Sequence, residues 1–396
     1  MKILSVLGFA NPFVGAGWTR IGFFADKWSR KGHIIEVLGA FSYKAFSKRG
    51  VKRLSNINIF NIIFNMGLTH PLVFILNTLI SFAVSTLALL SRKPNAAIVS
   101  VPTGDVGLGA IIACKLTRTK CIVDYRDRWE DYLISISKSR TTKNFYYAVK
   151  KLALRMYASC NLVVCVTPPC ISYLKKLGMN KVKFIPNGAD IKIFTPLKKS
   201  HELNSFNLIY VGGATAYYRI DLVINALKLL SNRNIRNFKL HIVGRIPQTA
   251  RNGLSNSDVI DNVVFHGEIS DFEKLAKIVA RGHVGIIPLS LDYVQAKSAL
   301  PVKFFEYCAC GVPVIATVPD DSILAKLIKE YKVGISVPSM DEKKLAEAIY
   351  RIYKNKPFRE AAGIKARRLI EEKFDRNKIA EEYLNLIGKV LGCRLI

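Results

Sequence analysis

The stretch SALPVKFFEYCACGVPVIAT, residues 298–317, is typical of a buried helix followed by a buried strand, yet its helical part carries two charges. Lys303 and Glu306 are three positions apart, so a helix places both on one face. Pro301 suits the first helical position, which leaves the next amides without helical partners and favours an anion there. We expect a ligand site at this helix start, with a plain ion pair between Lys303 and Glu306 as the alternative.

Patterns typical of strands and helices alternate throughout the chain. Residues 2–39 predict a strand, a turn-rich loop, an amphipathic helix and a second strand, which together form a βαβ unit. Further short apolar runs continue to residue 186, and they resume at residue 207 after the polar segment PLKKSHELNS. At 396 residues the chain is also too long for one ordinary core. We therefore predict two doubly wound α/β domains that meet near residue 200.

The chain is strongly basic, with 59 Lys and Arg against 29 Asp and Glu and a formal net charge of +30. Such a charge attracts nucleic acid, nucleotide phosphates or an anionic membrane surface without choosing among them. The sequence has no RNA-binding or DNA-binding motif, so nucleic acid is not an expected partner.

The cysteines and the first residues bear on the compartment. The 8 cysteines form no C-x-x-C pair and have no histidines at zinc-binding spacing, so we expect small buried thiols in a reduced compartment and no metal site. The start MKILSVLGFANPF predicts a first strand rather than a signal peptide. We expect the protein in the cytoplasm.

Two loops of the first half carry candidate ligand-binding residues. In NPFVGAGWTR, Gly15 and Gly17 let the backbone approach an anion at a helix start, although a plain tight turn is the favoured explanation of this loop taken alone. VDYRDRWEDY places Asp127 among other charges just beyond a predicted strand. The carboxyl ends of parallel strands face the ligand crevice in such sheets. A solvated loop with local ion pairs explains these residues equally well.

A third loop, YVGGATAYYRIDL, lies in the second half. Gly212 and Gly213 end a predicted strand, and Arg219 comes just before a helix. A guanidinium in that place can clamp a diphosphate through two hydrogen bonds, or it can simply lie on the surface.

Taken together, these features resemble the retaining glycosyltransferases of family 4, which have the GT-B fold. The matching motifs are GAG before the first helix, KGHIIEV, VDYRDRW, PNGADIKIF, YVGG, HVGIIPL and LPVKFFEYCACGVPVIA. The resemblance spans nearly the whole chain, and the last motif, an LPxKxxEY variant, is the most specific. It implies two Rossmann-like domains facing a cleft: an acceptor domain over 1–200, a nucleotide-sugar domain over 201–375, and a helix over 376–396 that crosses back.

The resemblance also implies roles for individual residues. Glu306 matches the carboxylate that binds the donor ribose, Arg219 falls at or near a phosphate-binding lysine, and Asp127 belongs to the motif facing the sugar. The expected catalytic residues are Asp127, Arg219 and Lys303. The expected donor-binding residues are Gly15, Ala16, Gly17, Gly212, Gly213, Arg219, Lys303 and Glu306.

Two positions depart from the family pattern. Ser298 stands eight residues before Glu306, where members often have a first glutamate, and Gly213 replaces an arginine that often follows the strand glycine. Many members with the LPxKxxEY variant also lack the first glutamate. These departures leave the predicted fold unchanged and bear only on the catalytic set.

The resemblance implies transfer of a sugar from a nucleotide-sugar donor, with retention, to a saccharide acceptor in surface glycan or glycoprotein glycan assembly. Lys303, Arg219 and the helix start would stabilise the departing nucleoside diphosphate electrostatically, so no metal or organic cofactor is expected. The alternatives are a nucleotide-sugar epimerase of the same fold and a catalytically inactive partner subunit, the latter favoured by Ser298 and Gly213.

A long apolar segment, NIIFNMGLTHPLVFILNTLISFAVSTLALL, covers residues 61–90. Pro71–Leu90 is long enough to span a bilayer, but spanning would put strands of one sheet on opposite sides of a membrane. The break at His70-Pro71 instead predicts an apolar helical hairpin over 56–90, with an inner-packed helix pair as the plain alternative. Nearby cations favour contact with an anionic membrane surface: Lys44, Lys48, Arg49, Lys52, Arg53, Arg92 and Lys93. We expect peripheral attachment to the inner membrane face, near a polyprenyl-linked acceptor.

Overall fold

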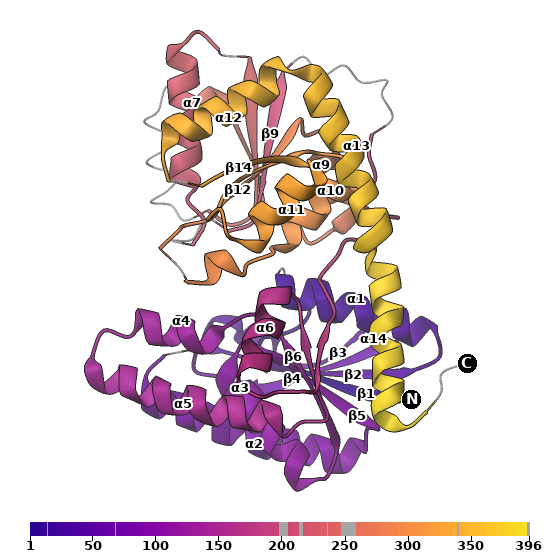
Figure 1. The fold of residues 1–396 in the computed structure, drawn as a ribbon. Helices are drawn as coiled ribbons and strands as arrows, with labels where there is room; N and C mark the ends of the chain where they lie inside the picture. Colours follow the sequence, from indigo (N-terminus) through magenta and orange to yellow (C-terminus); the bar gives the residue numbers. More distant parts are fainter. Residues whose placement is uncertain are drawn as a thin grey trace. The chain divides into compact units, whose positions relative to one another are not determined.

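The chain forms two compact units in a computed structural model. The structure describes residues 1–13, 15–67, 69–197, 205–213, 217–235, 237–246, 259–292, 294–338 and 340–393. The first unit comprises Met1–Pro186 and Asn377–Ile396, and the second comprises Asn187–Arg376 (Figure 1). The division at 186/187 lies ahead of the boundary predicted near residue 200.

Within its described part, the first unit is built on an eight-stranded sheet in the order β3-β4-β2-β1-β5-β6-β7-β8. Neighbouring strands are parallel except for edge strand β3, which is antiparallel to β4. Because the strand order reverses between β1 and β5, their carboxyl ends flank the place where a ligand binds such a sheet. The strands are β1 (Lys2–Leu7), β2 (Ile34–Phe41), β3 (Gly50–Leu54), β4 (Ile57–Phe64), β5 (Ala96–Val101), β6 (Lys120–Tyr125), β7 (Leu162–Cys165) and β8 (Val182–Phe184).

Helices cover both faces of this sheet. The helical segments are α1 (Ala16–Arg30), η1 (Tyr43–Lys48), α2 (Pro71–Arg92), α3 (Gly104–Leu116), α4 (Trp129–Ile136), α5 (Arg140–Ala158), α6 (Pro168–Lys176) and α14 (Arg376–Leu391). Helices α1 and α14 share one core, in which Phe24, Trp28 and Tyr383 are stacked or in edge contact. The indole nitrogen of Trp28 donates a hydrogen bond to the Ala380 carbonyl at 2.8 Å. The final helix is thereby fixed to the first sheet.

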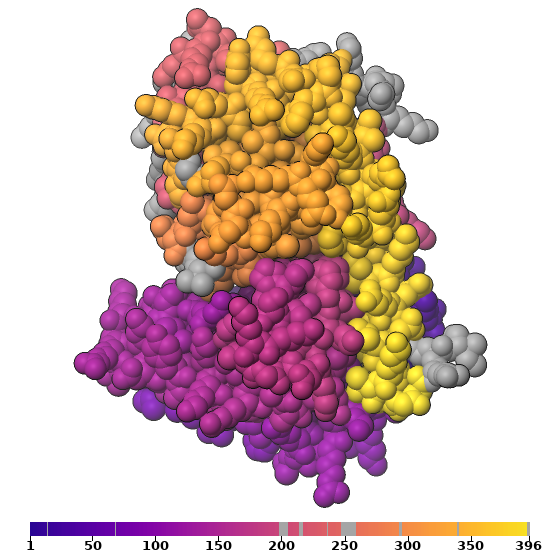
Figure 2. Space-filling view, viewed as in Figure 1, coloured from indigo at the N-terminus to yellow at the C-terminus, as the bar shows by residue number. Residues whose placement is uncertain are grey.

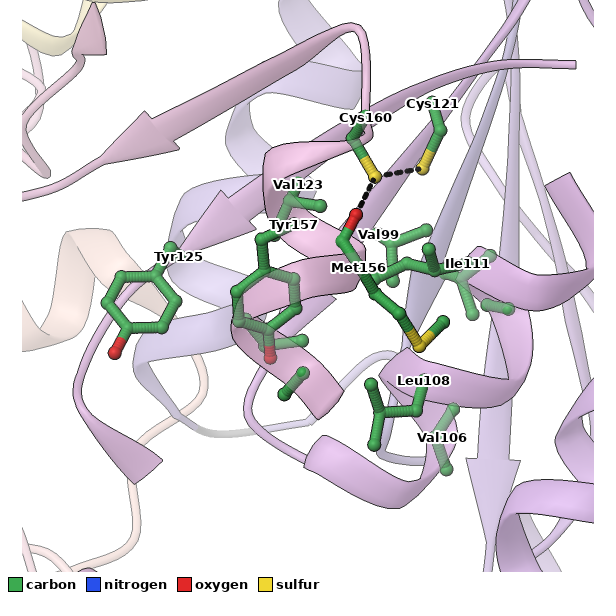
Figure 3. Close-up of a cluster of buried hydrophobic side chains, with 14 of the residues drawn as sticks. Val99, Val106, Leu108, Ile111, Cys121, Val123, Tyr125, Met156, Tyr157 and Cys160 are labelled. Atoms are coloured by element: carbon green, nitrogen blue, oxygen red, sulfur yellow. Dashed lines mark hydrogen bonds between the residues drawn. The ribbon is translucent and has the colours of Figure 1, made fainter. Parts of the chain in front are cut away.

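The opposite face carries a second core, formed by α2, α3 and α5 on the strands. Figure 3 shows part of it, with Val99 and Val123 from the sheet beside Ile111 of α3 and Tyr157 of α5. The sulfur of Cys160 lies 3.7 Å from that of Cys121, and both thiols are free. Seven of the eight cysteines are buried and unbridged, as expected for small apolar residues.

The predicted helical hairpin over 56–90 is wrong. Residues 57–64 form strand β4, and α2 is one uninterrupted helix of 22 residues. Along INIFNIIF, the side chains of Ile57, Ile59, Asn61 and Ile63 are buried while their neighbours are not. This period of two, with β-branched residues, favours a strand. Pro71 occupies the first turn of α2, so the sequence break marks a helix start rather than a turn between two helices.

The second unit has a six-stranded, wholly parallel sheet within its described part, in the order β11-β10-β9-β12-β13-β14. Its strands are β9 (Phe206–Val211), β10 (Phe238–Val243), β11 (Val263–Gly267), β12 (Val284–Pro288), β13 (Val314–Thr317) and β14 (Gly334–Val337). Its helical segments are α7 (Ile220–Asn232), η2 (Ile260–Asn262), α9 (Phe272–Ala280), η3 (Val294–Lys297), α10 (Val302–Ala309), α11 (Ile323–Tyr331), α12 (Glu342–Lys354) and α13 (Lys356–Lys373). The order reverses between β9 and β12, whose carboxyl ends are Val211 and Pro288. The predicted α/β fold of two parallel-sheet, Rossmann-like domains is confirmed.

Candidate functional site

The ammonium of Lys303 lies in an aromatic enclosure at the start of α10. The residue is only 6% exposed, and Nζ lies 3.7 Å from the centroid of the Tyr218 ring and 4.5 Å from that of Tyr210. A Cβ atom on Gly212 would lie 2.8 Å from Nζ, so the glycine at the end of β9 leaves room for the ammonium. Two parts of the chain that are distant in sequence therefore meet at the carboxyl end of the central strand β9: the connection from β9 to α7 and the start of α10.

No carboxylate in the described part of the chain forms an ion pair with this ammonium. Among the residues that the structure describes, Nζ of Lys303 has no hydrogen-bond partner, and the ion pair with Glu306 that was the plain alternative is not formed. Burial lowers the pKa of Lys303 to about 7, while the nearby charge of Glu306 acts in the opposite direction. A cation on two ring faces is stabilised by roughly 1–2 kcal/mol per ring, which is less than the desolvation of a buried charge costs. The environment is suited to an ammonium that acquires an anionic partner.

Glu306 lies one turn further along α10 and is also buried, at 4% exposure. Burial raises the pKa of its carboxyl, and the charges of Arg376 and Lys303 lower it. Arg376 is itself buried, and its guanidinium donates to the carbonyls of Asn187 at 3.0 Å and Gly188 at 2.6 Å. The start of α10 thus presents a cation and a carboxyl in succession along one face.

The glycine turn after β9 is held by hydrogen bonds. The amide of Gly212 donates to the Val243 carbonyl at 2.8 Å, and the hydroxyl of Tyr210 donates to the Gly213 carbonyl at 2.8 Å. Gly212 has φ of +131°, a backbone conformation that side chains disfavour. The predicted residues Gly212 and Gly213 therefore lie in the turn beside Lys303.

Arg219 lies at the start of α7, next to Tyr218. Its backbone amide donates to the Pro288 carbonyl at 2.8 Å, which joins the segment to the end of β12. Its guanidinium pairs with Asp221, with Nε 2.9 and 3.0 Å from the two carboxylate oxygens. Since this pair is partly exposed, it contributes little to stability and an anionic ligand can replace it.

The remaining predicted residues belong to the first unit, at the end of its own sheet. Gly15 precedes α1 in extended conformation, and its carbonyl accepts from the Thr19 amide at 3.0 Å. Ala16 is the exposed first residue of α1. A Cβ atom on Gly17 would lie 2.9 Å from the Arg126 guanidinium, so this glycine permits close contact with the loop after β6.

Asp127 follows Arg126 in that loop. Arg126 donates from its amide to the Val101 carbonyl at 3.1 Å and from Nη2 to the Pro102 carbonyl at 3.2 Å, which fixes the loop against the end of β5. The side chain of Asp127 is exposed to solvent beyond the carboxyl end of β6. Desolvation raises the pKa of its carboxyl to about 6, and Arg126 opposes the shift.

Several structurally important residues were missed in the sequence. Tyr210 and Tyr218 enclose Lys303. Their positions in the sequence, close to the predicted site residues Gly212 and Arg219, could have indicated this role. Arg20 and Asp124 form a fully buried ion pair at 2.9 Å behind the loop of Asp127. In the sequence, this buried pair could have been predicted from the position of Asp124 inside an apolar strand. Among the described residues, no group of three or more His, Cys, Asp or Glu side chains is arranged to hold a metal ion.

Residues 193–369 match the family model of glycosyl transferases group 1. This range includes Gly212, Arg219, Lys303 and Glu306. The predicted resemblance is therefore confirmed in its coarser form, a glycosyltransferase group 1 match over this range. No curated protein sequence shows significant similarity to the chain.

Solved structures resemble the chain over nearly its whole length. Sucrose-phosphate synthase from Thermosynechococcus elongatus has a TM-score of 0.76 and 16% identity, with 99% of each chain covered. WaaG, a glycosyltransferase involved in lipopolysaccharide biosynthesis, has a TM-score of 0.72 and 15% identity over 97% of this chain and 99% of its own. Anabaena HepE in complex with UDP has a TM-score of 0.71 and 15% identity over 98% of this chain and 100% of its own. At these identities the likeness establishes the fold, which is GT-B as predicted.

Proposed function

We propose that the protein is a retaining hexosyltransferase of the family 4 type, which uses a nucleotide-sugar donor. The observation that carries the proposal is the buried ammonium of Lys303 at the carboxyl end of β9, which has no anionic partner among the residues that the structure describes. It lies within the part of the chain that matches glycosyl transferases group 1. The solved complex of HepE with UDP, which has the same fold, supports a nucleotide donor.

The donor diphosphate would lie between the start of α10 and the turn after β9. Its negative oxygens would accept hydrogen bonds from Lys303 and the first amides of α10, and Arg219 would exchange Asp221 for a phosphate. These groups favour the nucleoside diphosphate more as its charge grows during departure, which lowers the barrier to transfer. Glu306, one turn deeper, would accept two ribose hydroxyls.

Residues of the first unit would serve the sugar and the acceptor. Gly15 precedes α1, and Ala16 and Gly17 begin it with amides that favour an anion. Asp127 offers an exposed carboxyl that can accept hydrogen bonds from sugar hydroxyls. No nucleophile is assigned. We further propose that no metal or organic cofactor takes part, because protein cations are available for the leaving group.

The acceptor is proposed to be a saccharide linked to a polyprenyl diphosphate, used on the cytoplasmic face of a membrane in surface glycan or glycoprotein glycan assembly. A long apolar helix, α2, and the positive charge of the chain support this choice. The acceptor and the compartment are tested by assay with lipid-linked and water-soluble saccharides and by fractionation of cells that express the protein.

A calorimetric screen of UDP-, GDP- and ADP-sugars tests the donor site. We expect saturable binding of one class by the parent and by Lys297→Met, which removes an exposed lysine of the same unit. Lys303→Met should bind about tenfold or more weakly, since a charged hydrogen bond is worth roughly 1.5–3 kcal/mol. A folded parent that binds none of these nucleotide sugars contradicts the proposal.

The products separate this reaction from the two alternatives. An epimerase of the same fold would release a free sugar from the donor without an acceptor, whereas a transferase forms product only with one. An inactive partner subunit would do neither. Ser298, at the position of the missing glutamate, has its hydroxyl 3.3 Å from the Gln295 carbonyl in the turn before α10.

A further inference from the structure

The polarity of helix α2 is inverted. Its buried face carries Asn77, Ser81 and Ser85 between Phe74 and Leu89. Large apolar side chains lie on the outer face, with exposures from 43% to 69%: Leu72, Ile75, Leu76, Leu79, Leu87 and Leu90. A surface helix of a globular protein ordinarily has the opposite arrangement. The outer face is therefore suited to an apolar environment.

Specific contacts fix this orientation. The side-chain amide of Asn77 donates to the Asp105 carboxylate at 2.8 Å, and the hydroxyl of Ser81 donates to the Val106 carbonyl at 2.8 Å. A Cβ atom on Gly109 would lie 2.4 Å from the Thr78 carbonyl, so α2 and α3 are in close backbone contact. Rotating α2 to bury its leucines would break these bonds and leave buried polar groups unpaired.

The helix is also prevented from crossing a membrane. It is long and apolar enough to do so, but β4 before it pairs with β2, and β5 after it pairs with β1 in the same sheet. Strands that share hydrogen bonds cannot lie on opposite sides of a bilayer. The apolar face must therefore meet its partner sideways, along the helix.

Cations flank this face at its C-terminal end. Arg92 lies 4.2 Å from the centroid of the Phe60 ring, and Phe60 stands opposite Val51 on edge strand β3. Val51 is 70% exposed, and Arg53 lies on the same side of the strand, two residues on. The exposed Lys93 follows directly after the helix.

Helix α5 adds a second row of cations beside α2. The two helices are joined by contacts of Phe74 with the rings of Phe145 and Tyr146, at 6.0 and 5.8 Å between centroids. Both lie along the same side of the first unit in Figure 1, and side chains of α5 form part of the surface in Figure 2. Exposed cations recur at helical spacing along α5: Arg140, Lys143, Lys151 and Arg155.

We propose that the outer face of α2, flanked by the cations of α5 and of the β3 edge, docks on an anionic phospholipid bilayer. The leucines enter the interface while the cations contact the head groups, so binding depends on both apolar area and charge. A second copy of this chain is a poorer partner, because two such surfaces would bring like charges together in a molecule of net charge +30. This docking surface would bring the enzyme of the proposed function to its membrane. The proposal rests on that function only for the lipid-linked acceptor.

Vesicle flotation tests the proposal with the full chain. The parent should float with vesicles containing phosphatidylglycerol, less at high salt, and poorly with pure phosphatidylcholine. The triple variant Leu76→Gln, Leu79→Gln, Leu87→Gln should lose flotation by about tenfold or more, given the apolar contribution to interfacial binding. The triple variant Leu177→Gln, Leu197→Gln, Ile364→Gln, which changes three exposed apolar residues elsewhere, is the matched control and should float like the parent.

Substitutions of the cations on α5 separate the contribution of charge to membrane binding from that of apolar area. Lys143→Gln, Lys151→Gln and Arg155→Gln together should weaken binding to anionic vesicles and reduce its salt dependence. The control is Lys343→Gln, Lys344→Gln and Lys365→Gln, which removes the same number of exposed cations from the second unit. Circular dichroism and nucleotide-sugar titration verify that each variant is folded.

Two results would overturn the proposal. A folded parent that does not float with anionic vesicles rules out docking, and equal flotation of the parent and the leucine variant rules out this surface. If the parent fails to float but sediments as a dimer that the leucine variant abolishes, a second copy covers α2 instead. Donor binding is measured on soluble protein, so failure of docking is distinguishable from failure of the donor site.

Discussion

At Lys303, burial and aromatic rings act in opposite directions on the same charge. Burial lowers the pKa of the ammonium to about 7, whereas the faces of Tyr210 and Tyr218 favour the protonated form. Because the folded-state pKa lies below that of a free lysine, the unfolded chain holds more protons between about pH 7 and pH 10.4. The residue therefore destabilises the fold most at and below neutral pH.

Lys303→Met should stabilise the ligand-free protein below pH 7, and this advantage should shrink as pH rises toward 10, because the parent then loses its buried charge. Urea unfolding at pH 6, 8 and 9.5 measures the difference. Lys297→Met, at an exposed ion pair, is the control and should show no such trend. A pH-independent difference between Lys303→Met and the parent would contradict the lowered pKa.

An anion that binds Lys303 should restore its proton. Nucleotide binding above pH 7 should therefore take up a proton, and affinity should fall as pH rises above the free-state pKa of about 7. Titration calorimetry at pH 8 in buffers of different ionisation enthalpy measures the uptake. It should be lost in Lys303→Met, and equal uptake in parent and variant would place the proton on another group.

Glu306→Gln should weaken donor binding by about tenfold or more, because an amide offers one acceptor oxygen where a carboxylate offers two, and a charged hydrogen bond is worth roughly 1.5–3 kcal/mol. Calorimetric titration with the matching nucleotide sugar measures it. The exposed Glu347 on α12 supplies the control, Glu347→Gln. Equal affinity in Glu306→Gln and the parent would leave Glu306 a purely structural role.

At the scale of elements, α1 is linked to the rest of the first unit by two ion pairs of opposite character. Arg20 and Asp124 are both 0% exposed, and Nη1 of Arg20 also donates to the Pro186 carbonyl at 2.7 Å. Lys31 and Glu381 connect α1 to α14 at the surface, with side chains about half exposed. The first pair is desolvated and the second is screened by water.

Asp124→Asn should destabilise the protein by roughly 3–5 kcal/mol, because it leaves the buried guanidinium of Arg20 without a counter-charge. Glu381→Gln should change stability by less than about 1 kcal/mol, as exposed pairs do. Urea unfolding of both variants measures the contrast. Similar small changes in both would show that the Arg20 site rearranges to admit water.

For the whole molecule, the excess of positive charge bears on catalysis as well as on partners. The net charge of +30 raises the local concentration of anions, which would include the proposed donor, and salt screens this effect. It is also consistent with a leaving group stabilised by side chains and helix starts rather than by a divalent ion.

Turnover should therefore persist after exhaustive chelation and should fall with rising ionic strength, because screened cations attract the donor less. Initial rates with EDTA, and with magnesium or manganese restored, measure this. Activity that vanishes on chelation and returns with either ion would contradict metal-independent transfer.

The alternation of apolar runs with amphipathic helices was enough to predict two parallel-sheet domains, because strand and helix periods are local properties of the chain. The same locality placed Lys303 and Glu306 on one face of α10, and Gly212 at the end of a strand. The sequence-based prediction was wrong for residues 57–64, where a dense apolar stretch concealed the alternation of buried and exposed residues in a strand.

Tertiary structure alone decided the surroundings of these residues. Tyr210 and Tyr218 enclose Lys303 only because β9, the segment before α7 and the start of α10 meet at one end of the sheet. Arg219 pairs with Asp221, and α2 turns its serines inward, because of packing that the chain order does not specify. The physical reason is that burial, and with it the pKa of a charge and the choice of its partner, depends on atoms brought together from distant parts of the sequence.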